Sequence, residues 1–163
     1  MLLLFTDLDD TLFTSARKAA PTPAHVPLAY LKDGAPISYA SPCQQALLAH
    51  WQAHATMIPV TARNLDAYRR VRIPFPAHAV INHGGVILLP DGSADPAWLA
   101  QSRANAAQSI AGLEALAARL PATAALNTRL ICDYDIPFYL LMKSTTADLA
   151  PLDDAAGRLR PHL

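Results

Sequence analysis

The chain opens with an apolar run that ends in a cluster of acids. Residues 1–5 read Met-Leu-Leu-Leu-Phe, and Asp7, Asp9 and Asp10 follow directly. A short apolar run bounded by turn-forming acids predicts a strand of a parallel sheet that is buried on both faces. Ligands of open α/β sheets bind beyond the carboxyl ends of the strands, so we expect these acids to line a site.

Strands and helices are expected to alternate along the next part of the chain. The pattern predicts a hairpin over residues 28–39, a helix over 42–54, a strand over 56–61, a short helix over 64–71 and a strand over 77–82. The hairpin turns at Asp33-Gly34. Ser41 caps the first helix, with Pro42 at its first position. The order strand, helix, strand, helix, strand predicts a doubly wound parallel sheet of the α/β class.

The pattern changes after Val86. A hairpin arm over residues 86–89 turns at Pro90-Asp91-Gly92, and apolar positions at helical spacing predict one long helix over about 96–120. An antiparallel pair over 128–133 and 138–143 and a last helix from about Thr146 complete an α+β segment. We therefore expect a core domain over residues 1–88 and a second, cap-like segment over 89–163.

Composition narrows the function classes without choosing one. The 163 residues are 52% hydrophobic, enough for a packed core, and 13 basic residues balance 13 acidic ones. No strong field draws such a chain to nucleic acid or to an anionic membrane, and no apolar run reaches membrane-spanning length. Cys43 and Cys132 lie far apart, without the spacing of a redox or metal motif, which favours a reduced, cytoplasmic setting.

Asp7 and Asp9 carry the candidate chemistry. Side chains at i and i+2 of an extended segment leave it on the same side, so both carboxylates can face one substrate. Two acids so close repel each other unless a cation lies between them or one holds a proton. This arrangement suits a Mg²⁺-assisted nucleophile beside a general acid. The alternative is that these acids only cap the segment that follows the strand.

The pattern Asp-x-Asp-x-Thr after a buried strand resembles motif I of the haloacid dehalogenase (HAD) superfamily, most of whose members are phosphatases. The resemblance implies that Asp7 is the nucleophile and a Mg²⁺ ligand. It implies that Asp9 is the acid/base, with its backbone carbonyl also facing the metal, and that Thr11 supports the loop by bonding to backbone. Members of that family also carry a flap directly after the nucleophile strand. The resemblance implies that about residues 28–40 form this flap.

Two later segments extend the resemblance. Thr61 stands where HAD motif II has a hydroxyl that binds the phosphoryl group, and Ala62-Arg63 resembles the dipeptide that follows it in Cof-type members. Arg63 would then contact substrate or phosphate; the alternatives are a helix cap for Thr61 and a surface ion pair for Arg63. Residues 81–87, Ile-Asn-His-Gly-Gly-Val-Ile, resemble the segment where a C2-type cap begins in Cof-type and sucrose-phosphatase-like members. The glycines there suggest positive φ.

The resemblance covers only the first half of a HAD catalytic core. The family also needs a motif III Lys or Arg and a motif IV acid pair after the cap, for which Lys143 and Asp153-Asp154 are weak matches. We expect a phosphatase of small phosphorylated metabolites, sugar phosphates first. A phosphomutase and a non-catalytic module that binds a phosphorylated ligand or a partner remain open. The missing elements imply either a truncated chain or self-association and complementation by another chain.

Overall fold

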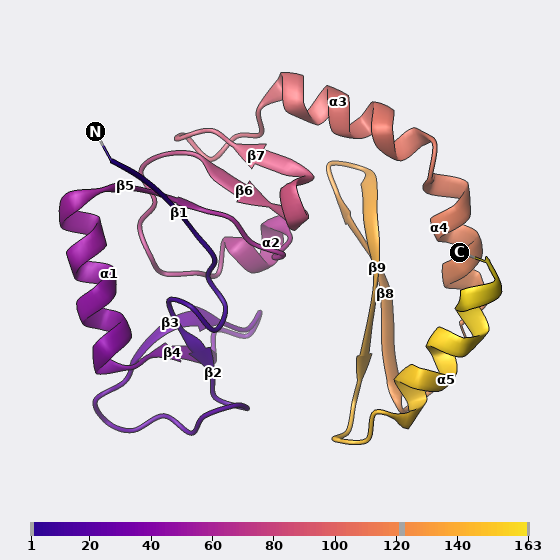
Figure 1. The fold of residues 1–163 in the computed structure, drawn as a ribbon, viewed down its shortest axis with the longest axis horizontal. Coiled ribbons are helices and arrows are strands. Elements are labelled where there is room, and N and C mark those ends of the chain that lie inside the picture. The colour runs from indigo at the N-terminus through magenta and orange to yellow at the C-terminus, as the bar shows by residue number, and fades with distance from the viewer. Residues whose placement is uncertain (1, 121–122, 163) are drawn as a thin grey trace. The chain divides into compact units, whose positions relative to one another are not determined.

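The computed structural model describes residues 2–120 and 123–162, and these form a mixed α/β chain (Figure 1). The chain divides into two compact units, Met1–Leu99 and Ala100–Leu163. The boundary expected near residue 88 therefore falls inside the first unit. Strand β7 (Val86–Leu88) pairs back onto β6 (Ala79–Ile81), which holds this segment in the first unit.

Among the described residues of the first unit, parallel pairing between strands involves β1, β5 and β6. Strand β1 (Leu3–Thr6) runs parallel to β5 (Thr56–Pro59), and a single parallel bridge joins Val60 to Val80 in β6. The other sheets of the described residues are antiparallel. The α/β class is therefore present, while the parallel ladder is narrower than the doubly wound sheet that the alternation of strands and helices predicts.

The expectation that β1 is buried on both faces is wrong. Leu4 packs against the core, but Leu3 is 46% exposed and Phe5 is 63% exposed. Successive strand residues point to opposite faces, so Leu3 and Phe5 share one face and Leu4 belongs to the other. In the described residues β1 pairs with β5 alone, so its second edge carries no strand.

The predicted hairpin is confirmed and forms part of a three-stranded antiparallel sheet. Strands β3 (Val26–Tyr30) and β4 (Pro36–Ala40) turn through Gly34, whose φ is 85°. Residues 7–13, which contain Asp7, Asp9 and Asp10, form the loop between β1 and β2 that we call the acidic loop. Strand β2 (Thr14–Ser15) follows this loop and pairs with the other side of β4. The sheet therefore connects the hairpin directly to the loop that carries the acids.

Helix α1 (Pro42–His54) is confirmed with its predicted cap. Ser41 accepts from the Gln44 backbone N–H, and the Gln44 side chain accepts from the Ser41 N–H, which completes a capping box. Helix α2 (Leu65–Tyr68) is shorter than expected and is capped by Asn64. Residues from α1, β5, the acidic loop, the hairpin and the segment after α2 pack into one cluster of buried side chains: Leu8, Leu12, Phe13, Ala29, Leu48, Met57 and Ile73.

The single long helix expected over 96–120 is wrong. The structure has α3 (Pro96–Ala107) and α4 (Ile110–Ala118), with α3 running across the division between the units. The Ser109 N–H donates to the Ala106 carbonyl, a tighter turn than an α-helix makes, and Ser109 then begins α4. Serine competes for backbone hydrogen bonds and so favours helix ends over helix interiors.

The antiparallel pair of the second unit is confirmed. Strands β8 (Leu126–Asp133) and β9 (Ile136–Ser144) turn at Tyr134 and Asp135, whose φ angles of 53° and 59° are those of a type I′ turn. The last helix starts later than expected, as α5 (Ala150–Leu159), and a short 3₁₀ turn, η2 (Arg160–His162), follows it.

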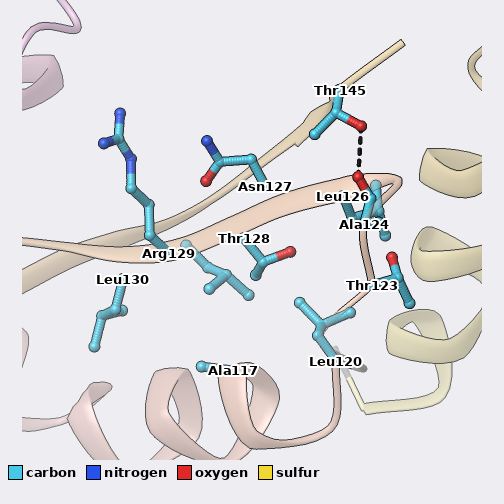
Figure 2. A pocket seen from close by; sticks show the side chains of 11 residues that line it. Ala117, Leu120, Thr123, Ala124, Leu126, Asn127, Thr128, Arg129, Leu130 and Thr145 are labelled. Carbon is cyan, nitrogen blue, oxygen red and sulfur yellow. Dashed lines mark hydrogen bonds between the residues drawn. The ribbon is translucent and has the colours of Figure 1, made fainter.

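A cavity of about 580 Å³ lies between α4 and β8 in the second unit. Figure 2 shows Leu120 and Ala117 on the helix side, with Thr128 and Leu130 on the strand side. No Asp or Glu is among the residues that line this cavity, so it lacks the carboxylates that the acidic loop of the first unit carries. Among residues 2–120 and 123–162, no helix is both long and apolar enough to span a bilayer.

Candidate functional site

The loops after three neighbouring strands meet at one edge of the first unit. The Val60 N–H donates to the Thr6 carbonyl at 2.8 Å, and the Thr61 N–H donates to the Val80 carbonyl at 2.9 Å. Asp7 follows β1, Thr61 follows β5, and Asn82 follows β6. The backbone bonds therefore bring the loops that carry Asp7 and Thr61 next to each other.

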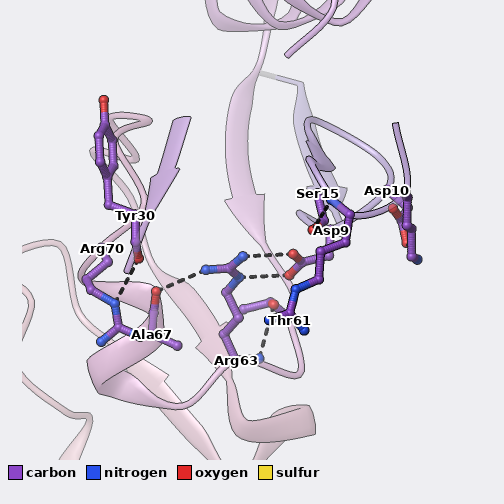
Figure 3. A network of polar contacts seen from close by, with 10 residues as sticks. Asp9, Asp10, Ser15, Tyr30, Thr61, Arg63, Ala67 and Arg70 are labelled. Atoms are coloured by element: carbon purple, nitrogen blue, oxygen red, sulfur yellow. Dashed lines mark hydrogen bonds and ion pairs between the residues drawn. The ribbon is translucent and has the colours of Figure 1, made fainter. Parts of the chain in front are cut away.

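Asp9 and Arg63 form a two-pronged ion pair across this edge (Figure 3). Arg63 Nε lies 2.7 Å from one carboxylate oxygen of Asp9, and Nη2 lies 2.7 Å from the other. The Arg63 side chain is 15% exposed, stands over the buried Phe13 ring at 5.2 Å and donates through Nη1 to the Ala67 carbonyl at 3.2 Å. Because it is paired with Asp9, stacked on Phe13 and largely buried, this guanidinium is held in one orientation.

Thr61 is buried, at 4% exposure, with its hydroxyl oxygen facing the next residues of its loop. That oxygen accepts a hydrogen bond from the Arg63 backbone N–H at 3.2 Å. A hydroxyl has one donor and two acceptor lone pairs, so the Thr61 proton is not consumed by this bond. Thr61 can therefore cap its own turn and still donate to an anionic oxygen.

Asp7 differs from its neighbours in the acidic loop. Its side chain is exposed, and among the described residues it makes no hydrogen bond or ion pair. Asp10 instead pairs with Lys18. The Thr11 side chain makes no hydrogen bond to another described residue, so the bond to backbone expected from it is not present. The Thr11 carbonyl accepts from Gln44 Nε2 at 3.1 Å.

The turn after β6 holds three successive residues in the left-handed region. Asn82, His83 and Gly84 have φ angles of 51°, 54° and 95°, and they form the short 3₁₀ turn η1 (Asn82–Gly84). The Asn82 N–H donates to the Arg63 carbonyl at 2.9 Å, and the His83 N–H donates to the Thr61 carbonyl at 3.2 Å. The positive φ suggested for the glycines is confirmed at Gly84, whereas Gly85 has a φ of −68°. Left-handed non-glycine residues cost energy and concentrate at functional sites.

A second acid–arginine pair lies beside this site, on α2 and the residues that follow it. Arg70 Nη1 lies 2.5 Å from the Asp66 carboxylate, and the hydrogen bond from Arg70 lowers the pKa of Asp66. Arg70 Nε also donates to the Tyr30 carbonyl at 3.0 Å (Figure 3). This side chain therefore connects α2 to strand β3 of the hairpin.

The two weak matches from the second half of the sequence lie in the second unit. Lys143 is an exposed residue of β9. Asp154 pairs with Arg158 one turn further along α5, at 3.0 Å, and Asp153 lies in the first turn of that helix. Acids in these positions are accounted for by helix stability alone.

The described residues bring together few groups that could ligate a metal ion. Within residues 2–120 and 123–162, no three side chains of His, Cys, Asp or Glu gather closely enough to hold an ion. The Asp7 carboxylate and the Asp9 backbone carbonyl are the oxygens that motif I would supply. Mg²⁺ keeps several waters and is commonly bound by one or two carboxylates together with substrate phosphate. A site of that kind would take one carboxylate and one carbonyl oxygen from this loop, whereas the described side chains form no all-protein cage.

Comparison with protein-family models gives no match, and comparison with curated proteins gives none either.

Proposed function

We propose that the chain is a Mg²⁺-dependent phosphomonoester hydrolase of the HAD type. Its substrates are small phosphorylated metabolites, sugar phosphates first, and the reaction passes through an aspartyl-phosphate. The observation that carries the proposal is the 2.8 Å bond from the Val60 N–H to the Thr6 carbonyl, which makes the loops of Asp7 and Thr61 neighbours. An exposed carboxylate on one loop and a buried hydroxyl on the neighbouring loop suit attack on an anchored phosphoryl group.

In this proposal residues 1–88 are part of a doubly wound HAD core, with residues 28–40 as its flap and residues 89–163 as a cap-like segment. The parallel β1–β5 ladder and the Val60–Val80 bridge support that arrangement. The three-stranded sheet supports the flap, because β2 joins the hairpin to the acidic loop.

Each side chain then has one role in the reaction. The Asp7 carboxylate attacks phosphorus while the Thr61 hydroxyl donates to a phosphoryl oxygen. The bond from phosphorus to the leaving oxygen breaks, and Asp9 gives that oxygen its proton. Asp9 later takes a proton from water, which attacks the aspartyl-phosphate, releasing phosphate and restoring Asp7.

The ion pair with Arg63 sets a condition on the role of Asp9. Both Asp9 oxygens accept from the guanidinium, at 2.7 Å each. A protonated carboxyl needs one oxygen for its own O–H, so Asp9 must release one of these two bonds before it can act as an acid. Three of the five N–H donors of Arg63 are engaged, which leaves two for a phosphoryl oxygen.

Mg²⁺ would be held by the Asp7 carboxylate and the Asp9 carbonyl together with the substrate. When bound, the ion would offset charge on the phosphoryl oxygens, so that the Asp7 carboxylate could approach phosphorus.

The test is hydrolysis of p-nitrophenyl phosphate with and without Mg²⁺, by the unchanged chain, Asp7→Asn and Asp10→Asn. We expect Mg²⁺-dependent turnover that Asp7→Asn removes by at least about a thousandfold, as loss of a nucleophile does. Asp10 is a matched control, because it is the neighbouring acid, pairs with Lys18 and has a φ of 60°, which asparagine adopts readily. Asp10→Asn should keep turnover within a few-fold.

Turnover that survives Asp7→Asn would refute the aspartyl-phosphate route. A phosphomutase would use the same Asp7 intermediate but pass the phosphoryl group to a sugar hydroxyl. Phosphate release from a hexose phosphate, against formation of its isomer, separates these two reactions.

A second candidate function is a non-catalytic module that binds a phosphorylated ligand or a partner chain. Two observations favour it: no three metal-ligating side chains gather in the described residues, and β1 leaves Leu3 and Phe5 exposed. An uncovered apolar strand is a ready surface for association. Phosphate binding without turnover, together with self-association in sedimentation that Phe5→Asp abolishes, would favour this candidate over the hydrolase.

A further inference from the structure

The indole of Trp98 lies against the turn that follows β6. Its Nε1–H donates to the Gly84 carbonyl at 2.9 Å, while the residue is 43% exposed. A tryptophan normally buries its ring and leaves the N–H to find a partner near the surface. The indole N–H is its one polar group and already has its partner, so what the indole can offer a ligand is apolar surface.

The position of this ring is fixed from two directions. The Asp95 carboxylate accepts from the Trp98 backbone N–H at 2.8 Å, and the Asp95 N–H donates to the Ile87 carbonyl at 2.8 Å. The start of α3 is thus attached to β7, and the indole N–H is attached to η1. A side chain that is already ordered loses little conformational freedom when a ligand packs on it.

The same turn reaches the candidate phosphoryl site. His83, next to Gly84, donates its N–H to the Thr61 carbonyl at 3.2 Å. Two residues of chain span at most about 7 Å, so this route places the Thr61 carbonyl oxygen within about 13 Å of the indole nitrogen. A phosphorylated monosaccharide, with its phosphate at one end and its ring at the other, has a size that falls within this upper limit.

We propose that Trp98 is a substrate-recognition residue, whose exposed face stacks against the C–H face of the sugar ring while the phosphoryl group lies at Asp7 and Thr61. The inference rests on the proposed function for the identity of the phosphoryl site. The π-face of an indole is electron-rich and apolar, and it therefore suits the slightly positive C–H groups of a sugar ring. An acyclic phosphoester offers no such face, so Trp98 selects for ring-containing substrates.

A binding measurement tests this without relying on turnover. The chain has two tryptophans, so Trp51→Phe leaves Trp98 as the sole indole. Its fluorescence is followed during titration with glucose 6-phosphate, fructose 6-phosphate and ribose 5-phosphate, and with glycerol 3-phosphate as the acyclic control. We expect a saturable change with at least one cyclic sugar phosphate and none with glycerol 3-phosphate. No change with any of the three sugar phosphates at 10 mM would overturn the proposal.

A kinetic comparison adds a second readout. The ratio of kcat/KM for the best sugar phosphate to kcat/KM for glycerol 3-phosphate should fall about five- to tenfold in Trp98→Ala, mainly through KM. Trp98→Phe, which keeps an aromatic face but loses the bond to Gly84, should retain most of that ratio. Equal losses on both substrates would mean that Trp98 has only a structural role.

The two proposals fail in different ways. If the chain hydrolyses no phosphoester, the proposed function is refuted. The fluorescence titration then tests only whether Trp98 contacts a bound sugar phosphate. A chain that hydrolyses both classes with the same ratio in Trp98→Ala keeps the proposed function and refutes the role of Trp98.

Discussion

The two faces of strand β1 meet different surroundings in the first unit. On one face Leu4 packs into the cluster that contains Leu48 of α1 and Met57 of β5. On the other face Leu3 is 46% exposed and Phe5 is 63% exposed. Leu3, Leu4 and Phe5 belong to one short segment, so the difference in their exposure comes from what covers each face. An apolar run indicates that a strand is able to be buried. Whether each face is buried depends on the elements that pack against it.

Substitutions on the two faces provide the largest contrast. Met57→Ala, on the covered face at 3% exposure, should destabilise the first unit by about 2–4 kcal/mol, because it leaves a cavity in a packed core. Phe5→Ala should cost under about 1 kcal/mol, because the ring is already largely in solvent. Urea unfolding followed by circular dichroism measures both. A cost for Phe5→Ala equal to that of Met57→Ala would show that this face is covered in solution.

Local signals predicted much of the covered side. The Ser41 cap, the Pro42 start of α1 and the Asp33-Gly34 turn are all present, because each depends on residues within a few positions. The helix expected over 96–120 is broken near Ser109, since the apolar spacing is compatible with one helix or with two.

The site was only partly predictable for the same reason. Asp7 and Thr61 stand out because each follows a strand, and strand ends can be identified from the sequence. The pairing of Asp9 with Arg63 joins positions 54 residues apart and depends on how β1 and β5 align. The bond from Trp98 to Gly84 likewise depends on how strands β6 and β7 fold, and no spacing in the sequence predicts it.

The capping box is the next test, because α1 supplies part of the cover over Leu4. Ser41→Ala removes the hydroxyl that accepts from the Gln44 N–H and should cost about 1 kcal/mol. Ser109 is a matched control: it begins α4 but makes no side-chain capping bond. Ser109→Ala should change the free energy of unfolding by less than about 0.5 kcal/mol. Equal effects from the two serines would refute the energetic role of the box.

Gly84 tests whether the turn beyond β6 depends on backbone conformation. A Cβ built there meets nothing within 4 Å, so any cost of Gly84→Ala comes from its φ of 95°. We expect a loss of about 1 kcal/mol. Gly157→Ala is the control, because a Cβ there also meets nothing within 4 Å and the helical backbone of α5 suits alanine. A neutral Gly84→Ala would mean that the turn relaxes, and the fluorescence of Trp98 should then change with it.

The smallest expected effect concerns the ion pair between Asp66 and Arg70, whose arginine also donates to the Tyr30 carbonyl of the hairpin. The hydrogen bond from Arg70 lowers the pKa of Asp66 below its ordinary 3.8. A carboxyl with a lowered pKa in the folded state adds stability above its unfolded pKa, and that stability is lost as pH falls through the folded pKa. Stability should therefore decline below about pH 3.8 with a contribution that Asp66→Asn removes. Because the Asp66 side chain is 53% exposed, 1 M salt should weaken this contribution in the unchanged chain. Unfolding curves from pH 5 to pH 2 that are parallel for the two proteins would show that the pair does not stabilise the fold.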